Sequence, residues 1–251
     1  MNLTEFKILT LDCYGTLIDW ERGLLAALHP LVARASGVRS PDQALEIFAQ
    51  HEFAQQNETP AMPYSQLLAV VYQRLATAWG VTINSEEANI FGASVPDWPP
   101  FPDSTAALAY LKRHYRLVIL SNVDRASFRA SNERLQVVFD AIYTAQDIGS
   151  YKPDLRNFAY LLQRLKNDFG VEKSAILHVA QSLLHDLAPA NQCGMASAWI
   201  DRRHAKKGSG ATKPPEKIPK YDYRFDSLAA LVQAHQKELS GEMSPAVQRS
   251  P

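Results

Sequence analysis

The stretch FKILTLDCYGT, residues 6–16, decides the fold class of this chain. Its apolar residues predict a buried strand, and the strand stops at an acid, Asp12, before a short turn segment. A carboxylate at the carboxyl end of a buried strand is poorly solvated unless charged or hydrogen-bonding groups meet it there. Because ligands of open α/β sheets bind at that edge, Asp12 is a candidate functional residue.

The rest of the chain shows two patterns of predicted secondary structure. Residues 17–97 predict helices only, whereas alternation of strands and helices follows the proline-rich stretch at 99–102 and continues to about residue 230. We expect helices over 20–35, 40–56, 64–79, a short one from 85, and then 103–114, 124–135, from 154 and from 227; strands are expected at 117–120, 141–143, 175–179, 198–200 and 223–225. The pattern predicts an α/β fold with a parallel sheet that carries an all-helical insertion.

Composition narrows the classes of function. The chain has 251 residues, of which 46% are hydrophobic, enough for a sizeable core. Its 26 basic and 26 acidic residues cancel, which argues against binding nucleic acid through bulk charge. Two cysteines are too few for a disulfide framework, no apolar run is long enough for a membrane span, and the N-terminus lacks a signal-peptide pattern. We expect a cytoplasmic protein without nucleic-acid or membrane partners.

Three further motifs follow apolar segments: Leu120-Ser121-Asn122, Tyr151-Lys152-Pro153-Asp154, and Asp186 after the strand at 175–179. Together with the spacing Asp12-x-Tyr14-Gly15-Thr16, their order resembles the haloacid dehalogenase superfamily. The resemblance implies a Rossmann-like catalytic core, residues 1–17 and 98–235, with an inserted helical cap, residues 18–97. We expect residues 236–251 to form a disordered tail.

The resemblance also implies roles for these residues. Asp12 would be a nucleophile that forms a covalent intermediate, Lys152 would balance its charge, and Asp186 would orient or activate the hydrolytic water. Ser121 and Asn122 would donate hydrogen bonds to an anionic substrate group, although helix capping explains them locally as well. Thr16 would either cap a helix or contact the substrate.

Tyr14 favours one branch of the superfamily. Its phosphatases usually carry a second aspartate two residues after the nucleophile, which protonates the leaving alcohol. A tyrosine has too high a pKa to do this easily at pH 7. Tyrosine at this position is similar to the L-2-haloacid dehalogenase branch, in which a halide leaves without a proton. We therefore place Tyr14 among the substrate-binding residues.

The metal-ligand set of the phosphatases is incomplete here. They typically carry an acid where Gln181 stands, and Mg²⁺ prefers several oxygen ligands. We expect no cofactor and no metal-binding residues, and Mg²⁺ stays open for the phosphatase alternative.

The sequence departs from characterised dehalogenases in its substrate-recognition residues. They use a cap arginine to hold the substrate carboxylate, but residues 42–57 contain none, and Gln50 and His51 are the nearest polar candidates. Characterised dehalogenases also carry an active-site tyrosine six residues after the lysine and an asparagine three residues before the last aspartate. Phe158 and Leu183 stand at these two positions here. The substrate is expected to be a small molecule, in particular a small organic acid.

Three functions therefore stay open. The first is a metal-independent hydrolase of the 2-haloacid dehalogenase type; the others are a magnesium-dependent phosphatase and a catalytically weak binding or regulatory protein. The loop at 202–220 either overhangs the site or, as we expect, is a solvated surface loop. The oligomeric state is open, with a homodimer as one alternative.

Overall fold

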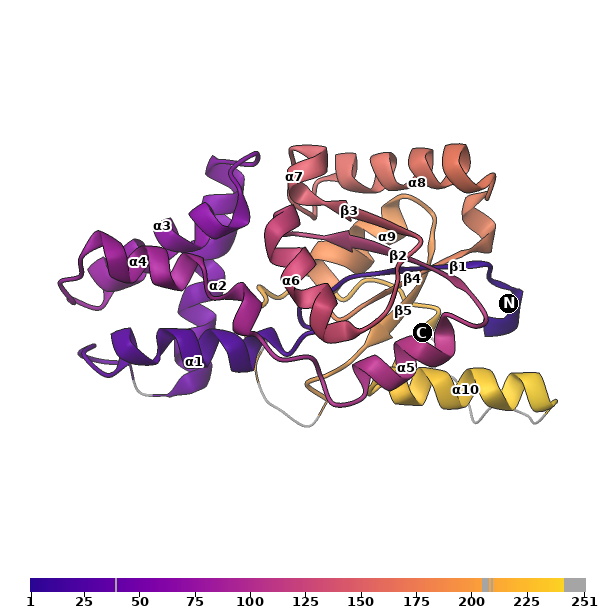
Figure 1. Cartoon of the computed structure of the whole chain (residues 1–251), viewed down its shortest axis with the longest axis horizontal. Helices are drawn as coiled ribbons and strands as arrows, with labels where there is room; N and C mark the ends of the chain where they lie inside the picture. Colours follow the sequence, from indigo (N-terminus) through magenta and orange to yellow (C-terminus); the bar gives the residue numbers. More distant parts are fainter. Residues whose placement is uncertain (39, 205–207, 209, 242–251) are drawn as a thin grey trace.

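A computed structural model describes residues 1–38, 40–204, 208 and 210–241. The centre is a six-stranded parallel sheet in the order β3-β2-β1-β4-β5-β6 (Figure 1). Its strands are β1 (Ile8–Leu11), β2 (Arg116–Ser121), β3 (Ala141–Thr144), β4 (Ile176–Ala180), β5 (Ala196–Ile200) and β6 (Tyr223–Phe225). The expected α/β fold with a Rossmann-like core is confirmed.

The register of the parallel strands brings the candidate motifs to the same level of the sheet. Leu11 of β1 pairs with Ile119 of β2 on one side and with Val179 of β4 on the other. Because the strands are parallel, their carboxyl ends meet at one edge of the sheet. The residues just beyond these pairs, Asp12 and Asn122 among them, therefore lie at the same edge.

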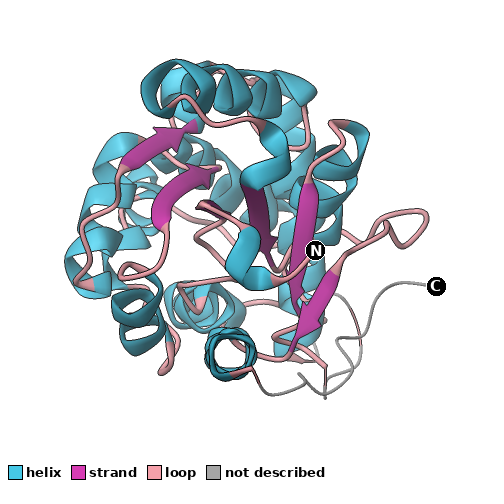
Figure 2. Ribbon diagram, turned by 90° about the vertical axis from the view of Figure 1, so that its right-hand side faces the viewer, coloured by secondary structure: helices cyan, strands magenta, loops and turns pink. Residues whose placement is uncertain are grey.

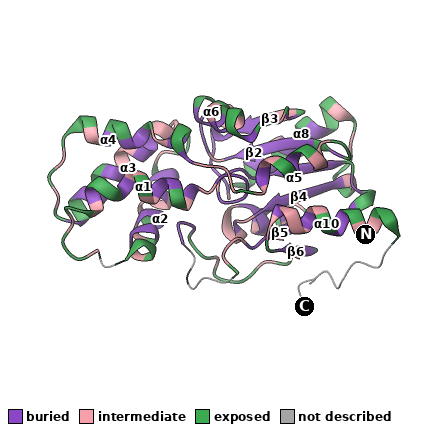
Figure 3. Cartoon of the chain, turned by 60° about the horizontal axis from the view of Figure 1, so that its bottom comes forward, coloured by how far each residue is buried: buried purple, intermediate pink, exposed green. Residues whose placement is uncertain are grey.

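Helices cover both faces of the sheet (Figure 2). The core helices are α5 (Ser104–Leu111), α6 (Arg125–Leu135), α7 (Ala145–Ile148), α8 (Leu155–Phe169), α9 (Ala188–Gln192) and α10 (Leu228–Ser240). On one face, Phe158, Leu161 and Leu165 of α8 pack against Val118 and Ile176. The strands between these layers are buried almost throughout (Figure 3), which explains their continuous apolar runs.

Four helices between β1 and β2 lie beyond one end of the sheet, and we call them the cap (Figure 1). They are α1 (Trp20–Val32), α2 (Pro41–Glu58), α3 (Tyr64–Ala78) and α4 (Ser85–Gly92). Ser40 caps α2 as its sequence predicts, since its side chain accepts a hydrogen bond from the Gln43 amide at 3.2 Å. Short single-turn helices η1 (Leu3–Glu5), η2 (Val95–Asp97) and η3 (Lys173–Ala175), and the π-helix η4 (Leu183–Leu187), complete the described elements.

Several boundaries differ from expectation, and the helix expected over 20–35 ends at Val32. The helix expected over 103–114 ends at Leu111. The expected tail at 236–251 is wrong for its first five residues, because α10 continues through Ser240. Glu238 on this helix accepts a hydrogen bond from the Thr4 amide at 3.1 Å, which ties the end of α10 to the first turn of the chain. Residues 242–251 of that prediction lie outside the described residues. Within the described part of the chain, no helix has the length and apolar character that crossing a bilayer requires.

Candidate active site

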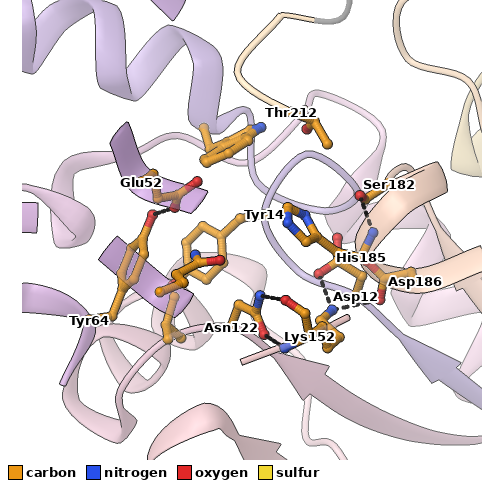
Figure 4. A pocket seen from close by; sticks show the side chains of 13 residues that line it. Asp12, Tyr14, Glu52, Tyr64, Asn122, Lys152, Ser182, His185, Asp186 and Thr212 are labelled. Atoms are coloured by element: carbon orange, nitrogen blue, oxygen red, sulfur yellow. Dashed lines mark hydrogen bonds and ion pairs between the residues drawn. The ribbon is translucent and has the colours of Figure 1, made fainter. Parts of the chain in front are cut away.

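Three charged side chains meet at the carboxyl edge of the sheet (Figure 4). Asp12 follows β1, Lys152 lies in the turn between α7 and α8, and Asp186 lies in η4 after β4. Lys152 Nζ donates to Asp12 Oδ1 at 2.9 Å, to Asp186 Oδ1 at 2.6 Å and to the Leu120 carbonyl oxygen at 2.9 Å. The structure thus brings together the three residues that the sequence marks as catalytic.

Burial and charge set the protonation of this group. Burial opposes the charged form of Lys152, but the two carboxylates outweigh it and raise the lysine pKa. Burial likewise acts to raise the pKa of Asp186, but Lys152 and the hydrogen bond from His178 lower it below the ordinary value. Burial prevails at Asp12, whose pKa is raised despite Lys152. Asp12 is therefore the more basic of the two carboxylates, which suits a nucleophile.

Thr16 and Asn122 position these groups. Thr16 Oγ1 donates to Asp12 Oδ2 at 2.7 Å and accepts from the Gln181 amide at 2.9 Å. Asn122 accepts from the Lys152 amide at 2.7 Å and donates to the Lys152 carbonyl at 2.9 Å. Asn122 also lines the pocket above Asp12, whereas Thr16 does not. Thr16 therefore orients the Asp12 carboxylate, and its contact with substrate stays a prediction.

Ser121 departs from its predicted role. Its side chain is 2% exposed, its hydroxyl has no hydrogen-bond partner among the described residues, and it is absent from the pocket wall. Side chains of a strand alternate between the two faces, so neighbours such as Ser121 and Asn122 do not both turn to the same cavity. Of this pair, Asn122 alone lines the pocket, and its contact with substrate stays a prediction.

Tyr14 lines the pocket as the sequence predicts, but its hydroxyl is already engaged. It forms a 2.8 Å hydrogen bond with Ser131 Oγ, and the ring makes an edge contact with Trp98 at 5.6 Å between centroids. Burial raises the pKa of Tyr14 well above its ordinary value. Tyr14 is therefore an apolar wall and no proton donor for a leaving group near neutral pH.

His178 contacts the charged group, although the sequence analysis gives it no role. It is fully buried in β4, its Nε2 lies 3.0 Å from Asp186 Oδ1, and its Nδ1 lies 2.9 Å from Thr10 Oγ1. The first contact positions the Asp186 carboxylate, and the second fixes the His178 ring that makes it. The sequence carries one sign of this role, because His178 is a titratable residue at the centre of an otherwise apolar strand.

The cap supplies the opposite wall of the pocket. Thirteen residues enclose about 40 Å³ of water-accessible space: Asp12, Tyr14, Trp20, Glu52, Gln56, Tyr64, Asn122, Val123, Lys152, Ser182, His185, Asp186 and Thr212. Tyr64 donates a 2.7 Å hydrogen bond to Glu52, and both side chains are buried. Of the candidates that replace the missing arginine, neither Gln50 nor His51 lines this pocket, because the buried face of α2 carries Glu52 and Gln56 instead.

The loop that follows β5 overhangs the site rather than lying in solvent. Thr212 lines the pocket, and the Ala211 amide donates to Glu21 on α1 at 3.1 Å. Arg203 pairs with the same Glu21 and, at 3.0 Å, with Asp42 of α2. The described part of this loop therefore joins core and cap at the rim, which corrects the expectation of a solvated loop.

The donor set does not fit a divalent cation. Lys152 Nζ lies between Asp12 and Asp186, where a bridging cation would bind both carboxylates. Gln181 is uncharged, lines neighbouring cavities and not this one, and its Oε1 lies 3.5 Å from Thr212 Oγ1. Among the described residues, no cluster of three or more acidic, histidine or cysteine side chains suits a metal ion.

A carboxylate that faces a small pocket, with a lysine beside it and a second carboxylate behind the lysine, is equipped for nucleophilic attack followed by hydrolysis. This site, at the carboxyl edge of a parallel α/β sheet, defines a hydrolase. The chain belongs to the haloacid dehalogenase-like hydrolases, whose family model matches residues 6–194.

Individual relatives are distant. The pyrimidine 5'-nucleotidase YjjG of Escherichia coli (strain K12) is 22% identical over 139 residues, which span 53% of this chain and 60% of that relative. A defluorinating L-2-haloacid dehalogenase has a similar structure, with a TM-score of 0.73 and 17% identity over 94% of this chain and 98% of that one. The L-2-haloacid dehalogenase of Xanthobacter autotrophicus with covalently bound chloropropionic acid is also similar, with a TM-score of 0.72 and 16% identity. The match covers 92% of this chain and 98% of that one. At these identities the structural likeness establishes the fold.

Proposed function

We propose that this hydrolase cleaves an activated carbon–halogen bond through a covalent ester on Asp12, the reaction type of the 2-haloacid dehalogenases. The observation that carries the proposal is the sharing of Lys152 Nζ between Asp12 and Asp186, at 2.9 and 2.6 Å, beside a pocket in which Tyr14 replaces a proton donor. A halide leaves as an anion and needs no such donor.

In the first half-reaction, an Asp12 carboxylate oxygen attacks the carbon that bears the halogen. The new C–O bond forms as the C–halogen bond breaks, and the halide leaves with the electron pair. Lys152 and Thr16 hold the two carboxylate oxygens, so the attacking group is fixed before the substrate arrives.

In the second half-reaction, water attacks the carbonyl carbon of the Asp12 ester. Asp186, held by Lys152 and His178, is placed to orient this water and to receive its proton. One Asp12 oxygen becomes the ester oxygen, and the donor on the other, Lys152 Nζ if Oδ2 attacks or the Thr16 hydroxyl if Oδ1 attacks, stabilises the negative charge that develops on the carbonyl oxygen. Collapse of that intermediate releases the hydroxylated product and restores Asp12.

The test is an assay with matched 2-halo compounds and phosphate monoesters, in chelator and in Mg²⁺. We expect chelator-insensitive halide release that depends on Asp12. Magnesium-dependent phosphate release without halide release would favour the nucleotidase-like alternative suggested by the YjjG relative. Absence of both activities, together with a ligand-dependent shift in melting temperature, would favour a binding protein.

A further inference from the structure

Glu52 of α2 is a buried carboxyl group that the proposed reaction does not use. It is 4% exposed and lies on the cap side of the pocket, across from the charged group at Asp12 (Figure 4). Its Oε1 accepts the hydrogen bond from Tyr64. No hydrogen bond from a described residue reaches its Oε2. Because Glu52 lines the pocket, this oxygen is available to accept a hydrogen bond from a donor on a bound molecule.

Gln56 presents a second acceptor in the same pocket. It is one helical turn after Glu52, and residues four apart share a helix face. The side chain is 5% exposed, and Oε1 is buried without a hydrogen-bond partner. Glu52 and Gln56 therefore both line the cap side of the pocket, and each carries an acceptor oxygen without a hydrogen bond from a described residue.

The charges of the pocket disfavour an anionic substrate. The described residues that line it include three acids, Asp12, Glu52 and Asp186, and one cation, Lys152, whose three N–H groups are all engaged. His185 adds no cation near neutral pH, because burial lowers its pKa to about 4. A substrate carboxylate would be buried there without a positively charged partner, an arrangement that is strongly unfavourable.

The overhanging loop carries a cation, Lys213, beside an adjoining cavity. Lys213 Nζ lies 4.5 Å from the centroid of the Phe53 ring and lines an adjoining cavity. It does not line the pocket at Asp12. Lys213 is therefore the residue to exclude by experiment as a holder of a substrate carboxylate.

We infer that Glu52 and Gln56 determine the specificity of this site by binding the NH₂ group of a small 2-halocarboxamide. The two N–H donors of a primary amide match the two free acceptor oxygens, and the amide is uncharged. Its carbonyl group activates the neighbouring C–halogen bond for displacement, as a carboxylate does. This inference rests on the proposed carbon–halogen hydrolysis, and it replaces the small organic acid expected from the family resemblance with the corresponding amide.

The reaction balances as it does for an acid. Asp12 forms a C–O bond to C2 as chloride leaves with its electron pair. Water then adds to the ester carbonyl carbon, and the bond between that carbon and the ester oxygen breaks. One water is consumed, and one 2-hydroxyamide, one chloride and one proton are released, with no oxidant or reductant involved.

Turnover is tested with (S)-2-chloropropionamide and (S)-2-chloropropionate, which share a carbon skeleton and leaving group. Chloride release is measured at pH 8 and counted beyond two equivalents per chain, because haloamides alkylate thiols and the chain has two cysteines. We expect kcat/KM to be at least about tenfold higher for the amide, in line with the loss expected when a buried polar group is left unpaired.

Two variants of α2 test the assignment. Glu52→Gln keeps the volume and the acceptor for Tyr64 but removes the charge, and should reduce the amide-to-acid ratio about tenfold. Glu46→Gln makes the same chemical change at an exposed position of the same helix and should leave the ratio unchanged. A preference for the acid that is lost in Lys213→Ala would overturn the inference, as would a ratio unaffected by Glu52→Gln.

Binding of the two products separates recognition from catalysis and needs no variant of the cap. We expect calorimetric titration of the wild type to show tighter binding of lactamide than of lactate. If lactamide binds preferentially but no chloride is released from either substrate, the proposed function fails and the recognition site stands. If lactate binds as tightly as lactamide, the recognition site fails whatever the turnover.

Discussion

Lys152 Nζ lies 2.9 Å from Asp12 Oδ1, although 140 positions separate the two residues along the chain. Both side chains are buried, and the lysine is 1% exposed. A buried carboxylate stays ionised only when charge or hydrogen bonds compensate its lost hydration. Lys152 supplies that compensation and remains beside the carboxyl group when it becomes an ester. One contact therefore serves both half-reactions.

Asp12→Asn should abolish turnover, with a loss of about 10³-fold or more, because an amide is a far weaker nucleophile than a carboxylate. Halide release and circular dichroism would be measured together, and the fold should be retained. In the wild type, a single turnover in oxygen-18 water should place the label in Asp12, and product should carry it only in later turnovers. Label that enters product first, with Asp12 unlabelled, would reject the covalent mechanism.

Lys152→Met should reduce kcat by about 10²- to 10³-fold, since it removes the group that stabilises charge on the Asp12 ester. It also leaves Asp12 and Asp186 buried without their cation, at a cost of about 3–5 kcal/mol in the free energy of unfolding. Carboxyl groups without a cation have raised pKa values, so the variant should regain stability relative to wild type as the pH falls. Urea unfolding from pH 8 to pH 5 measures this, with the exposed Lys166→Met as control. Equal stability at every pH would show that Lys152 does not neutralise these acids.

Glu52→Gln should stabilise the fold in a pH-dependent way. Burial raises the pKa of Glu52 from 4.5 to about 7. The native state therefore binds more protons than the unfolded state between these values, and the wild type loses stability as the pH rises through this window. The variant lacks this loss, so its advantage should be small below pH 4.5 and reach roughly 3 kcal/mol above pH 7. Denaturant unfolding at pH 4.5 and pH 8 checks the change, with Glu46→Gln as the matched control. An advantage that is the same at both pH values would contradict the prediction.

His178→Asn should lower kcat about tenfold with little effect on KM, because His178 positions Asp186 and does not line the pocket. The hydrogen bond from His178 lowers the pKa of Asp186, so its loss should raise that pKa. The acidic limb of the kcat–pH profile should then move to higher pH. His29→Asn, at an exposed position of the cap, serves as control. A fall in kcat with an unmoved acidic limb would indicate general loss of packing instead.

The sheet and the first group of site residues were predictable because their signals are local. The buried strand that stops at Asp12 needs only the run of residues before it, and the parallel strands of the core follow from apolar runs between helical stretches. Parallel strands bring their carboxyl ends to one edge, so the meeting of Asp12 with Lys152 and Asp186 followed from the topology. The order of the motifs was enough to place the chain in its family.

By itself, then, the sequence determined the α/β core, the helical insertion and the identity of the charged group, since each depends on short-range patterns of polarity. Only the tertiary structure decided what faces that group. The phase of α2 and the way the cap docks turn Glu52 and Gln56 into the pocket and leave Gln50 outside. The contact of His178 with Asp186, and the approach of Thr212 over the pocket, likewise depend on packing between separate elements. Such contacts arise from the summed burial of many side chains, and no local pattern encodes them.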